Sequence, residues 1–550
     1  AAYEVPRSTV EQESVAHVPM WSTGEGTTEP DQSAGDTIQQ TEGTYTIDAQ
    51  LHGPIKPFVS SAHVTQKGIS VRTRTRWPGL VRRTVARVMG IQPARVTVHS
   101  DTPTIDRDAS LYLPAQLAAW AAVAATKFRT RVVLRVTPEM MTLTGGRSST
   151  RVHWSASIDE QGAIVRNNVW VTLHGGAYPL LSGETRERIR LQATDLYREH
   201  AHSLSISAET VPSTPLGVFE GLHSSQIAFA REMHVTRVAE LAQQDPVHFR
   251  LSQLNDAAAE AADVCRQAAR QSDFHRRFAA NELQKKRRTE LDPLAERTRG
   301  IGFALALQRS GFVTGEEIGS VTVRLEQEGR AVLHCSLPAP NPRIKAAWRA
   351  VVAKNLGVDV ENVLLNSEYG GDATDSGPAF LSRGASIVPR AVVSACTAIQ
   401  KQRFRKPLPL QVRRAIRRPR GARSLADRGI AVGAAVVEVE VNPATMEIDV
   451  RSVTLAVKPG QVLDRLALEA EMRRGIYQAL GWTLHEGLPD PQNAQEMIRE
   501  GTYSTVNRGK RPRMRITLVP GLDTDPAAGV GELPFSTIPA ATVSALSQAT

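Results

Sequence analysis

The stretch AAVVEVEVNPATMEIDVRSVTLAV at 434–457 predicts a β-hairpin and is the plainest structural signal in the chain. Its first strand alternates between two faces, with valines on one and glutamates on the other (Val437, Val439 and Val441 against Glu438 and Glu440). Asn442-Pro443-Ala444-Thr445 supplies the turn. The second half of the chain is therefore expected to contain an antiparallel sheet.

Strands and helices alternate on both sides of this hairpin. In the second half, strands are expected at about 300–307, 318–325, 330–336, 362–367 and 513–518, and helices at about 344–355, 384–402 and 465–480. In the first half, strands within 44–75 and at about 95–98, 131–136, 150–158 and 163–173 accompany helices at about 80–90, 113–127 and 223–243. The predicted fold class is mixed α/β (α+β).

The 550 residues are too many for one hydrophobic core, so two large domains are expected. The predicted division is a tail or arm poor in strands at 1–35, a first domain at 36–255, a charged helical linker at 256–295 and a second domain at 296–550. Because residues 1–35 hold no basic and then apolar leader, either a signal was removed or none existed. A cytoplasmic and a periplasmic location of a soluble protein both stay open.

Composition excludes several classes of protein. No run of about 18 apolar residues occurs, so no membrane span is expected. The three cysteines, Cys265, Cys335 and Cys396, are too few and too far apart for a disulfide scaffold, a zinc ribbon or an iron–sulfur cluster within this chain. The histidines show no H-x-x-x-H or H-E-x-x-H spacing, so no metal site is predicted.

The most basic stretch is KQRFRKPLPLQVRRAIRRPRGAR at 401–423, which holds ten Lys or Arg residues and no acid. Its three prolines predict an exposed connector rather than a helix. A solvated linker, a docking surface for an acidic partner and a nucleic-acid-binding arm are the alternatives. Nucleic acid is the least favoured partner, because no aromatic ladder accompanies the charges.

Seven segments, in order, resemble the large, molybdopterin-binding subunit of the xanthine dehydrogenase and aldehyde oxidase family, as typified by isoquinoline oxidoreductase. The segments are GDTIQQTEGTYTIDAQLHGP, WPGLVRRTVARVMGIQPARVTV, ELAQQDPVHFRLSQLN, KNLGVDVENVLL, SGPAFLSRGAS, VVEVEVNPATMEIDVRSV and GVGELPFSTIPAA. The resemblance covers nearly all of residues 35–550. It implies two large, elongated domains of the molybdenum hydroxylase type.

The resemblance further implies an oxidoreductase that hydroxylates an aldehyde or an N-heterocycle with molybdopterin cytosine dinucleotide. It implies a separate iron–sulfur subunit as partner. Glu532, in Gly529-Val530-Gly531-Glu532, matches the family's general base, and Gly529, Gly531, Ser382 and Arg383 match segments that border the cofactor. Without the resemblance, Glu532 would be expected to be an exposed residue of a turn. For Ser382-Arg383, a helix-start serine beside an exposed arginine is an equal alternative.

Six positions depart from the family's cofactor motifs. The glycine-rich loop is replaced by DTPTIDRDAS at 101–110, G-Q-G by Asn341-Pro342-Arg343, and the arginine of Y-R-G by Glu220; the other departures are HGPIKP at 52–57, Lys458 and Glu471. Side chains and proline obstruct the backbone approach to phosphates that glycine permits.

Two hypotheses follow. In the first, the chain is a structural or regulatory homologue with a degenerate or absent cofactor pocket, a pseudoenzyme that pairs with the iron–sulfur subunit and with a second, active large subunit. In the second, it is an active molybdopterin-dependent oxidoreductase with Glu532 as its base. The departures favour the first.

Overall fold

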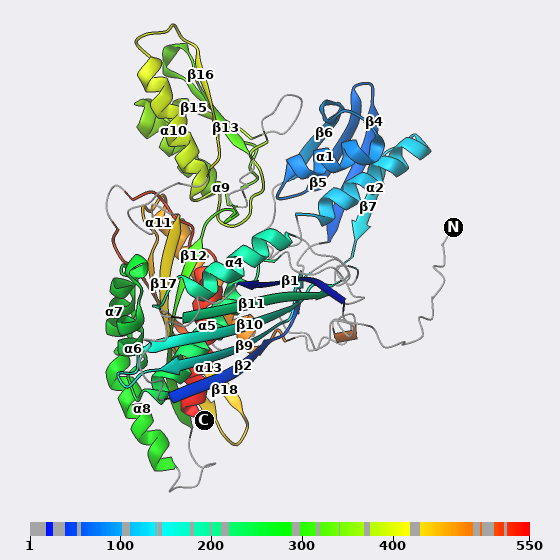
Figure 1. The fold of residues 1–550 in the computed structure, drawn as a ribbon. Coiled ribbons are helices and arrows are strands. Elements are labelled where there is room, and N and C mark those ends of the chain that lie inside the picture. The colour runs from blue at the N-terminus through cyan, green and yellow to red at the C-terminus, as the bar shows by residue number, and fades with distance from the viewer. Residues whose placement is uncertain are drawn as a thin grey trace, which may run out of the picture.

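The computed structural model describes residues 18–25, 39–51, 57–101, 111–137, 140, 146–176, 181–198, 201–210, 219–288, 297–314, 319–339, 341–367, 375–417, 429–487, 496–497, 511–521 and 525–550. These residues form a mixed α/β fold, as the sequence predicts (Figure 1). No helix among them is long and apolar enough to span a membrane.

The first half contains two sheets and a short ribbon. The five-stranded sheet has the order β1 (Val18–Glu25), β11 (Ala201–Thr210), β10 (Ile164–His174), β9 (Thr150–Ile158) and β2 (Gln39–Ile47). The second sheet has the order β6 (Val96–Asp101), β5 (Gly68–Arg74), β4 (Phe58–Thr65) and β7 (Val132–Val136), and β3 (Gln50–Leu51) pairs with β8 (Gly146–Arg147). Within the expected tail 1–35, β1 pairs antiparallel with β11.

The predicted hairpin at 434–457 is confirmed and lies at the centre of the second half. It consists of β17 (Ile430–Asn442) and β18 (Glu447–Lys458), and its sheet has the order β12 (Thr298–Arg309), β17, β18 and β19 (Arg513–Leu518). A further sheet has the order β15 (Val363–Asn366), β14 (Ala331–His334), β13 (Ser320–Leu325) and β16 (Leu410–Ala415).

The helices cover these sheets. They are α1 (Pro78–Met89), α2 (Leu113–Phe128), α4 (Ser182–Thr194), α5 (Ser224–Leu241), α6 (Pro246–Gln253), α7 (Ala261–Ser272), α8 (Phe274–Arg288), α9 (Pro342–Leu356), α10 (Ile387–Gln402), α11 (Arg465–Leu484) and α13 (Leu533–Ala549). Helices α1 and α2 pack on the β6-β5-β4-β7 sheet, and α9 and α10 on the β15-β14-β13-β16 sheet. Each of these two sheets is therefore half of a small α/β module (Figure 1).

Two parts of the chain differ from the sequence-based expectation. The expected basic connector at 401–423 begins inside α10 and contributes strand β16, which pairs with β13; residues 418–423 lie outside the described residues. The prediction of a connector is wrong here. An edge strand with basic side chains that point to solvent has the same sequence pattern as a solvated linker. The expected linker at 256–295 contains α7 and α8, and α7 packs in the same core as β12 and β17; residues 289–295 lie outside the described residues.

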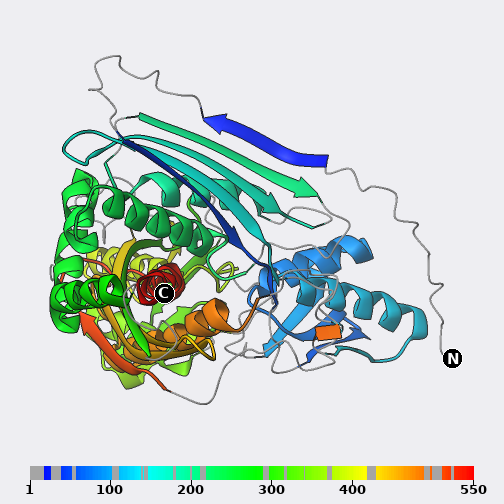
Figure 2. The same ribbon diagram turned by 90° about the horizontal axis from the view of Figure 1, so that it is seen from below.

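Helix α13 occupies the middle of the second half, where Figure 2 shows it end-on beneath the label of the C-terminus. It packs on β12 through two glycines: a Cβ atom on Gly300 would lie 1.8 Å from the carbonyl oxygen of Ala545, and one on Gly302 would lie 2.1 Å from that of Ala541. Backbone cannot give way as a side chain can, so the strand needs glycine here. On its other side α13 contacts α5, which covers the five-stranded sheet.

The two halves are joined by a buried carboxylate on α5. Glu232 Oε2 accepts hydrogen bonds from Arg250 Nε at 2.8 Å and from the backbone N–H of Leu305 in β12 at 2.9 Å, while Oε1 accepts from Tyr197 and Arg231. Although burial alone would raise the pKa of this carboxyl, Arg250 and Arg231 outweigh that effect and lower it. Glu232 is therefore charged and fully paired in the core.

We predict that Glu232→Gln lowers the free energy of unfolding by about 3–5 kcal/mol, because it leaves two buried guanidinium groups without their countercharge. Urea titration followed by circular dichroism measures the loss. The control is Glu187→Gln on α4, whose ion pair with Arg190 is partly exposed and should contribute about 1 kcal/mol or less. Equal losses in the two variants would contradict the prediction.

Candidate functional site

The loop that precedes α13 is held close to two other segments of the second half. A Cβ atom on Gly529 would lie 2.0 Å from the Cβ of Ser382, so only glycine fits at this position. The Gly529 N–H donates to Ser310 Oγ at 2.8 Å. The sequence-predicted residues Gly529 and Ser382 are therefore in direct contact, and that contact explains the glycine without any ligand.

A glutamine that sequence reasoning misses fixes the position of Glu532. Gln308 Oε1, on β12, accepts hydrogen bonds from the backbone N–H groups of Glu532 at 2.8 Å and Leu533 at 3.1 Å. The amide Nε2 of the same side chain donates to Ser382 Oγ at 2.9 Å. No motif in the sequence marks Gln308. Its role becomes visible only in the structure, where β12 places it beside the start of α13.

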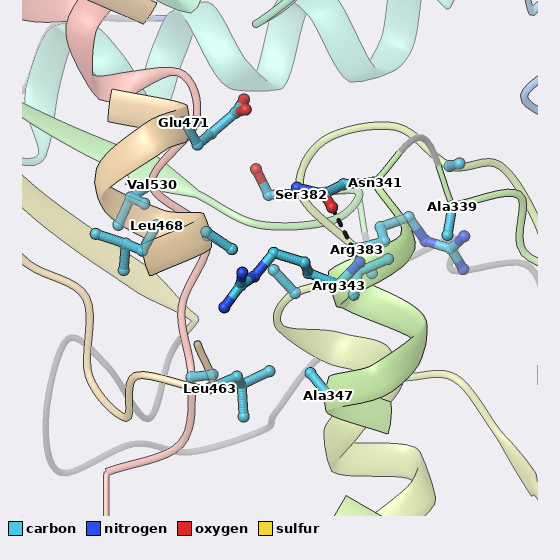
Figure 3. Close-up of a pocket in the computed structure, with 18 of the residues that line it drawn as sticks. Ala339, Asn341, Arg343, Ala347, Ser382, Arg383, Leu463, Leu468, Glu471 and Val530 are labelled. Atoms are coloured by element: carbon cyan, nitrogen blue, oxygen red, sulfur yellow. Dashed lines mark hydrogen bonds between the residues drawn. The ribbon is translucent and has the colours of Figure 1, made fainter. Parts of the chain in front are cut away.

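A cavity of about 300 Å³ adjoins this loop, between the starts of α9 and α11 (Figure 3). All the predicted site residues line it, and so do several positions at which the sequence departs from its family: Gly529, Gly531, Glu532, Ser382 and Arg383, together with Glu220, Asn341, Arg343 and Glu471. The remaining lining is mostly apolar, including Leu337, Ile344, Trp348, Phe380, Leu463 and Leu468. Residues 52–56 and 102–110 lie outside the described residues, and Lys458 instead pairs with Glu260.

Glu532 has an unusual protonation equilibrium. The side chain is only 9% exposed, and burial raises its pKa to about 7; Arg188 opposes the shift and the charge of Glu220 adds to it. A carboxyl with a pKa near neutrality can both accept and release a proton under ordinary conditions. Glu532 therefore has the property expected of a general base, although burial alone produces the same property in carboxyls that do no chemistry.

A second carboxylate lies next to Glu532. Glu220 lines the cavity from the loop before α5, and its Oε2 atom is buried without a hydrogen-bond partner among the described residues. In the same loop, a Cβ on Gly221 would stand 3.7 Å from Glu532 Oε2, so the two segments are close. Two neighbouring carboxyl groups disfavour a bound anion and favour a cation or a hydrogen-bond donor.

Two of the helix N-termini that face the cavity, those of α9 and α11, are closed by their own N-cap side chains. Asn341 caps α9 by accepting from the N–H of Arg343 at 2.9 Å, and Pro342 has no N–H to offer. Asp464 caps α11 by accepting from the N–H of Ala467 at 3.0 Å. The amides that would most readily hold a phosphate are therefore used within the protein.

Two arginines of the lining are likewise engaged with acids. Arg343 extends from the start of α9 into the space between the helices (Figure 3), and its Nε donates to Asp464 at 2.6 Å. Arg474 on α11 forms an ion pair with Glu471. The charges of these two arginines are matched by carboxylates, so neither has much capacity left for an anionic ligand.

Arg383 uses its guanidinium group to bind the backbone of its own loop rather than a ligand. It is fully buried, and its guanidinium donates to the backbone carbonyls of Pro378 at 2.7 Å and Ser376 at 3.2 Å. These bonds hold the 376–383 loop in shape. The alternative of a helix-start serine beside an exposed arginine is wrong, because α10 begins only at Ile387 and Arg383 is buried.

Comparison with known proteins identifies two matched regions. A family model described as a molybdopterin cofactor-binding domain matches residues 112–254, and a second model with the same description matches residues 267–408 and 417–499. Among curated proteins, a probable xanthine dehydrogenase subunit of Bacillus subtilis (strain 168) is 21% identical over 420 residues. The match covers 66% of this chain and 52% of that protein, so the chain spans about half the length of this relative.

Solved structures share the fold at low sequence identity. Quinoline 2-oxidoreductase from Pseudomonas putida 86 has a TM-score of 0.81 and 16% identity, over 96% of this chain and 76% of the other. Aldehyde oxidoreductase from Desulfovibrio gigas has a TM-score of 0.76 and 19% identity, over 94% and 59%. Reconstituted CO dehydrogenase from Oligotropha carboxidovorans has a TM-score of 0.82 and 11% identity, over 96% and 74%. The expected fold class is confirmed over most of the chain.

The raised pKa of Glu532 predicts a pH-dependent stability. Because the folded state holds the proton more tightly than the unfolded state, the stabilisation from protonated Glu532 is present below about pH 4.5 and is lost as the pH rises through about 7. Glu532→Gln removes this loss. Relative to the parent, its free energy of unfolding should rise by about 2–3 kcal/mol between about pH 5 and pH 8.

The matched control is Glu440→Gln. Burial favours a higher pKa for the Glu440 carboxyl, but Arg297 and Arg299 outweigh it, so the pKa is lowered and the group is ionised throughout this range. The difference between this variant and the parent should not change between about pH 5 and pH 8. Denaturant titrations at several pH values measure both differences; a flat response for Glu532→Gln would refute the raised pKa.

Proposed function

Since the chain belongs to the xanthine dehydrogenase/aldehyde oxidoreductase large-subunit family and carries its molybdopterin cofactor-binding domains, we propose that it is a non-catalytic member of a hydroxylase complex. In this proposal it keeps the shell of a large subunit and does not hold the molybdenum cofactor. Its role is structural or regulatory. Its partners are an iron–sulfur subunit and a second, active large subunit.

The observation that carries the proposal is the closure of the N-termini of α9 and α11 at the cavity. A pterin dinucleotide brings a pyrophosphate, which helix amides and glycine loops bind. In this chain Asn341 and Asp464 occupy those amides, and Pro342 removes another. Described residues that could replace them, such as Arg343 and Arg474, are already paired with carboxylates.

The volume and the charge of the cavity also support the absence of the cofactor. A cavity of about 300 Å³ is at the lower end of the range for drug-sized ligands, and a pterin dinucleotide is larger than most of these. Glu220 and Glu532 place two neighbouring carboxyls beside it, and the Oε2 atom of Glu220 has no hydrogen-bond partner among the described residues. We infer that the described residues do not fit this anionic cofactor, and that Glu532 reaches its high pKa through burial and the nearby charge of Glu220.

The second candidate function is an active molybdopterin-dependent oxidoreductase that hydroxylates an aldehyde or an N-heterocycle. The pKa of about 7 at Glu532 favours it, because a buried carboxylate at the edge of a cavity is suited to accept a proton from a reacting hydroxyl. Gly531 adds support, since a Cβ there would come within 3.5 Å of Glu471 and would narrow the cavity beside Glu532.

Metal and pterin analysis distinguishes the two candidates. The full chain is produced in a host that makes the cofactor, purified and assayed for molybdenum by mass spectrometry and for pterin by fluorescence after oxidation. We expect a folded protein with only traces of both. Stoichiometric molybdenum, with turnover that Glu532→Gln abolishes while the metal is retained, would overturn the proposal and establish the second candidate.

A further inference from the structure

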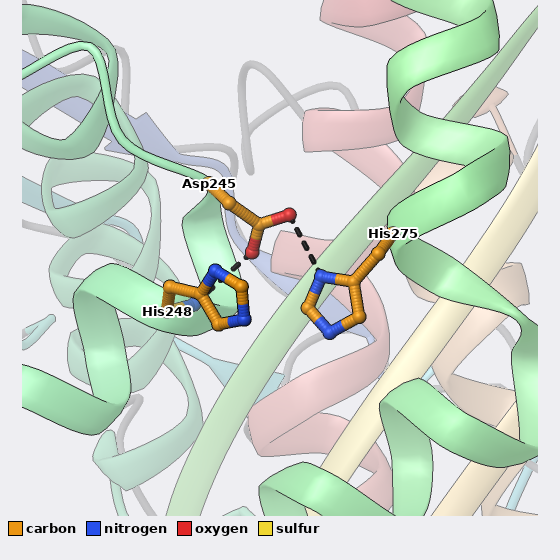
Figure 4. Close-up of side chains that lie close together, drawn as sticks. All are labelled: Asp245, His248 and His275. Atoms are coloured by element: carbon orange, nitrogen blue, oxygen red, sulfur yellow. Dashed lines mark hydrogen bonds and ion pairs between the residues drawn. The ribbon is translucent and has the colours of Figure 1, made fainter.

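Two side chains from the start of α6 and a third from the start of α8 meet on the surface of the chain. Asp245, His248 and His275 each offer one ligand atom, and these atoms all lie within 4.8 Å of one another (Figure 4). The two imidazole rings are stacked, with centroids 4.6 Å apart and planes inclined by 23°. None of the three residues lines the cavity beside Glu532.

Asp245 is held in place by the start of α6. Its Oδ1 accepts hydrogen bonds from the backbone N–H groups of Val247 at 2.8 Å and His248 at 3.0 Å, which makes it the N-cap of the helix. The other oxygen, Oδ2, accepts from Nδ1 of His275 at 2.9 Å. One carboxylate oxygen therefore fixes the group, and the other points at the imidazoles.

The two histidines come from rigid elements. His248 is the third residue of α6, in its first turn, after the N-cap Asp245, Pro246 and Val247. His275 is the second residue of α8, and its neighbour Phe274 is fully buried against Phe278 and Phe303. Asp273, with φ = 54°, breaks α7 from α8 and sets the direction in which His275 leaves the core. The approach of the rings is thus built into the backbone.

We propose that Asp245, His248 and His275 bind a divalent transition-metal ion of the zinc class. Two imidazole nitrogens and one carboxylate oxygen are a common three-ligand set for zinc. Tetrahedral bonds of about 2.0–2.2 Å require ligand atoms roughly 3.3 Å apart, which small side-chain rotations reach from the present spacing. The ion takes the place of the proton between His275 Nδ1 and Asp245 Oδ2, and the neutral imidazole of His275 then carries its one ring proton on Nε2.

The arrangement also has the outer support that metal ligands need. The two N–H groups of α6 orient the Asp245 carboxylate, as second hydrogen bonds do in known metal sites. The imidazoles are exposed or largely exposed, so water can fill the fourth position and the ion has an entry path. A helix cap alone accounts for Asp245 but gives no reason for His248 to stack on His275.

A bound ion would connect α6, at the end of the first half, to α8, which packs on the β12-β17-β18-β19 sheet of the second half. Helix α6 is bonded to α5 through Arg250, whereas α7 and α8 contact the β12-β17-β18 sheet. An ion that binds only the folded state stabilises it by mass action. The site is therefore structural, with an open position, rather than part of the cavity's chemistry.

The test uses the full chain stripped of metal with a chelator. Titration with zinc near neutral pH should show about one ion per chain and an upward shift of the melting temperature. Titration with Co²⁺ should give the visible absorption of a four-coordinate site with nitrogen and oxygen ligands. His248→Ala and His275→Ala should each abolish both signals, whereas the exposed control His99→Ala should leave them unchanged.

A further variant separates the cap from the ligand. Asn at the N-cap keeps the hydrogen bonds to α6 but not the negative charge, so Asp245→Asn should fold normally and bind zinc about tenfold or more weakly. Absence of binding in the parent would overturn the proposal. So would binding that survives His275→Ala or is lost equally in His99→Ala, since both results would mean adventitious ions only.

Discussion

The fold depends on a single buried carboxylate. Glu232 cannot remain charged in the core unless every lone pair is used, and its four hydrogen bonds come from four different parts of the chain: Arg250 of α6, Arg231 of α5, Tyr197 and the backbone of β12. Arg231 also donates to the carbonyl of Leu305, so the strand is bonded on both its N–H and its C=O. Orientation of the two halves is thereby specified by hydrogen-bond geometry, which apolar contact alone specifies poorly.

The hydrogen bonds of Glu232 also determine the shape of the cavity beside Glu532. Because Leu305 is fixed, Gln308 on the same strand is fixed too, and it positions the loop before α13. Two arginines of the lining are paired with carboxylates, Arg343 with Asp464 and Arg474 with Glu471, whereas Glu220 and Glu532 form no ion pair within the part of the chain that the structure describes. Under the proposed function, the scaffold of a cofactor-binding domain and the chemistry of its pocket are separable properties of one chain.

The sequence predicted the elements with strong periodicity and missed those whose nature depends on partners. The hairpin at 434–457 and helices such as 384–402 were visible because their apolar pattern is local. Strand β16 was not, since Leu410–Ala415 gains its identity only from pairing with β13. In the site, the family resemblance brought Glu532, Gly529 and Ser382 together, but no sequence pattern indicates that Gln308 would link them. The Asp245–His275 contact spans two helices and follows no spacing rule.

The glycine seat of α13 on β12 has a kinetic consequence. Gly300 and Gly302 meet Ala545 and Ala541, which follow them by almost the whole second half of the chain. Contacts between segments so far apart in the chain form slowly. We expect the β12-β17-β18-β19 sheet to form first, with the face that α13 later covers still exposed to solvent. That face is rich in valine and alanine, and a waiting intermediate of this kind is prone to associate with its neighbours. Successful production of this protein should therefore depend on how dilute, or how well chaperoned, the chain is before α13 docks.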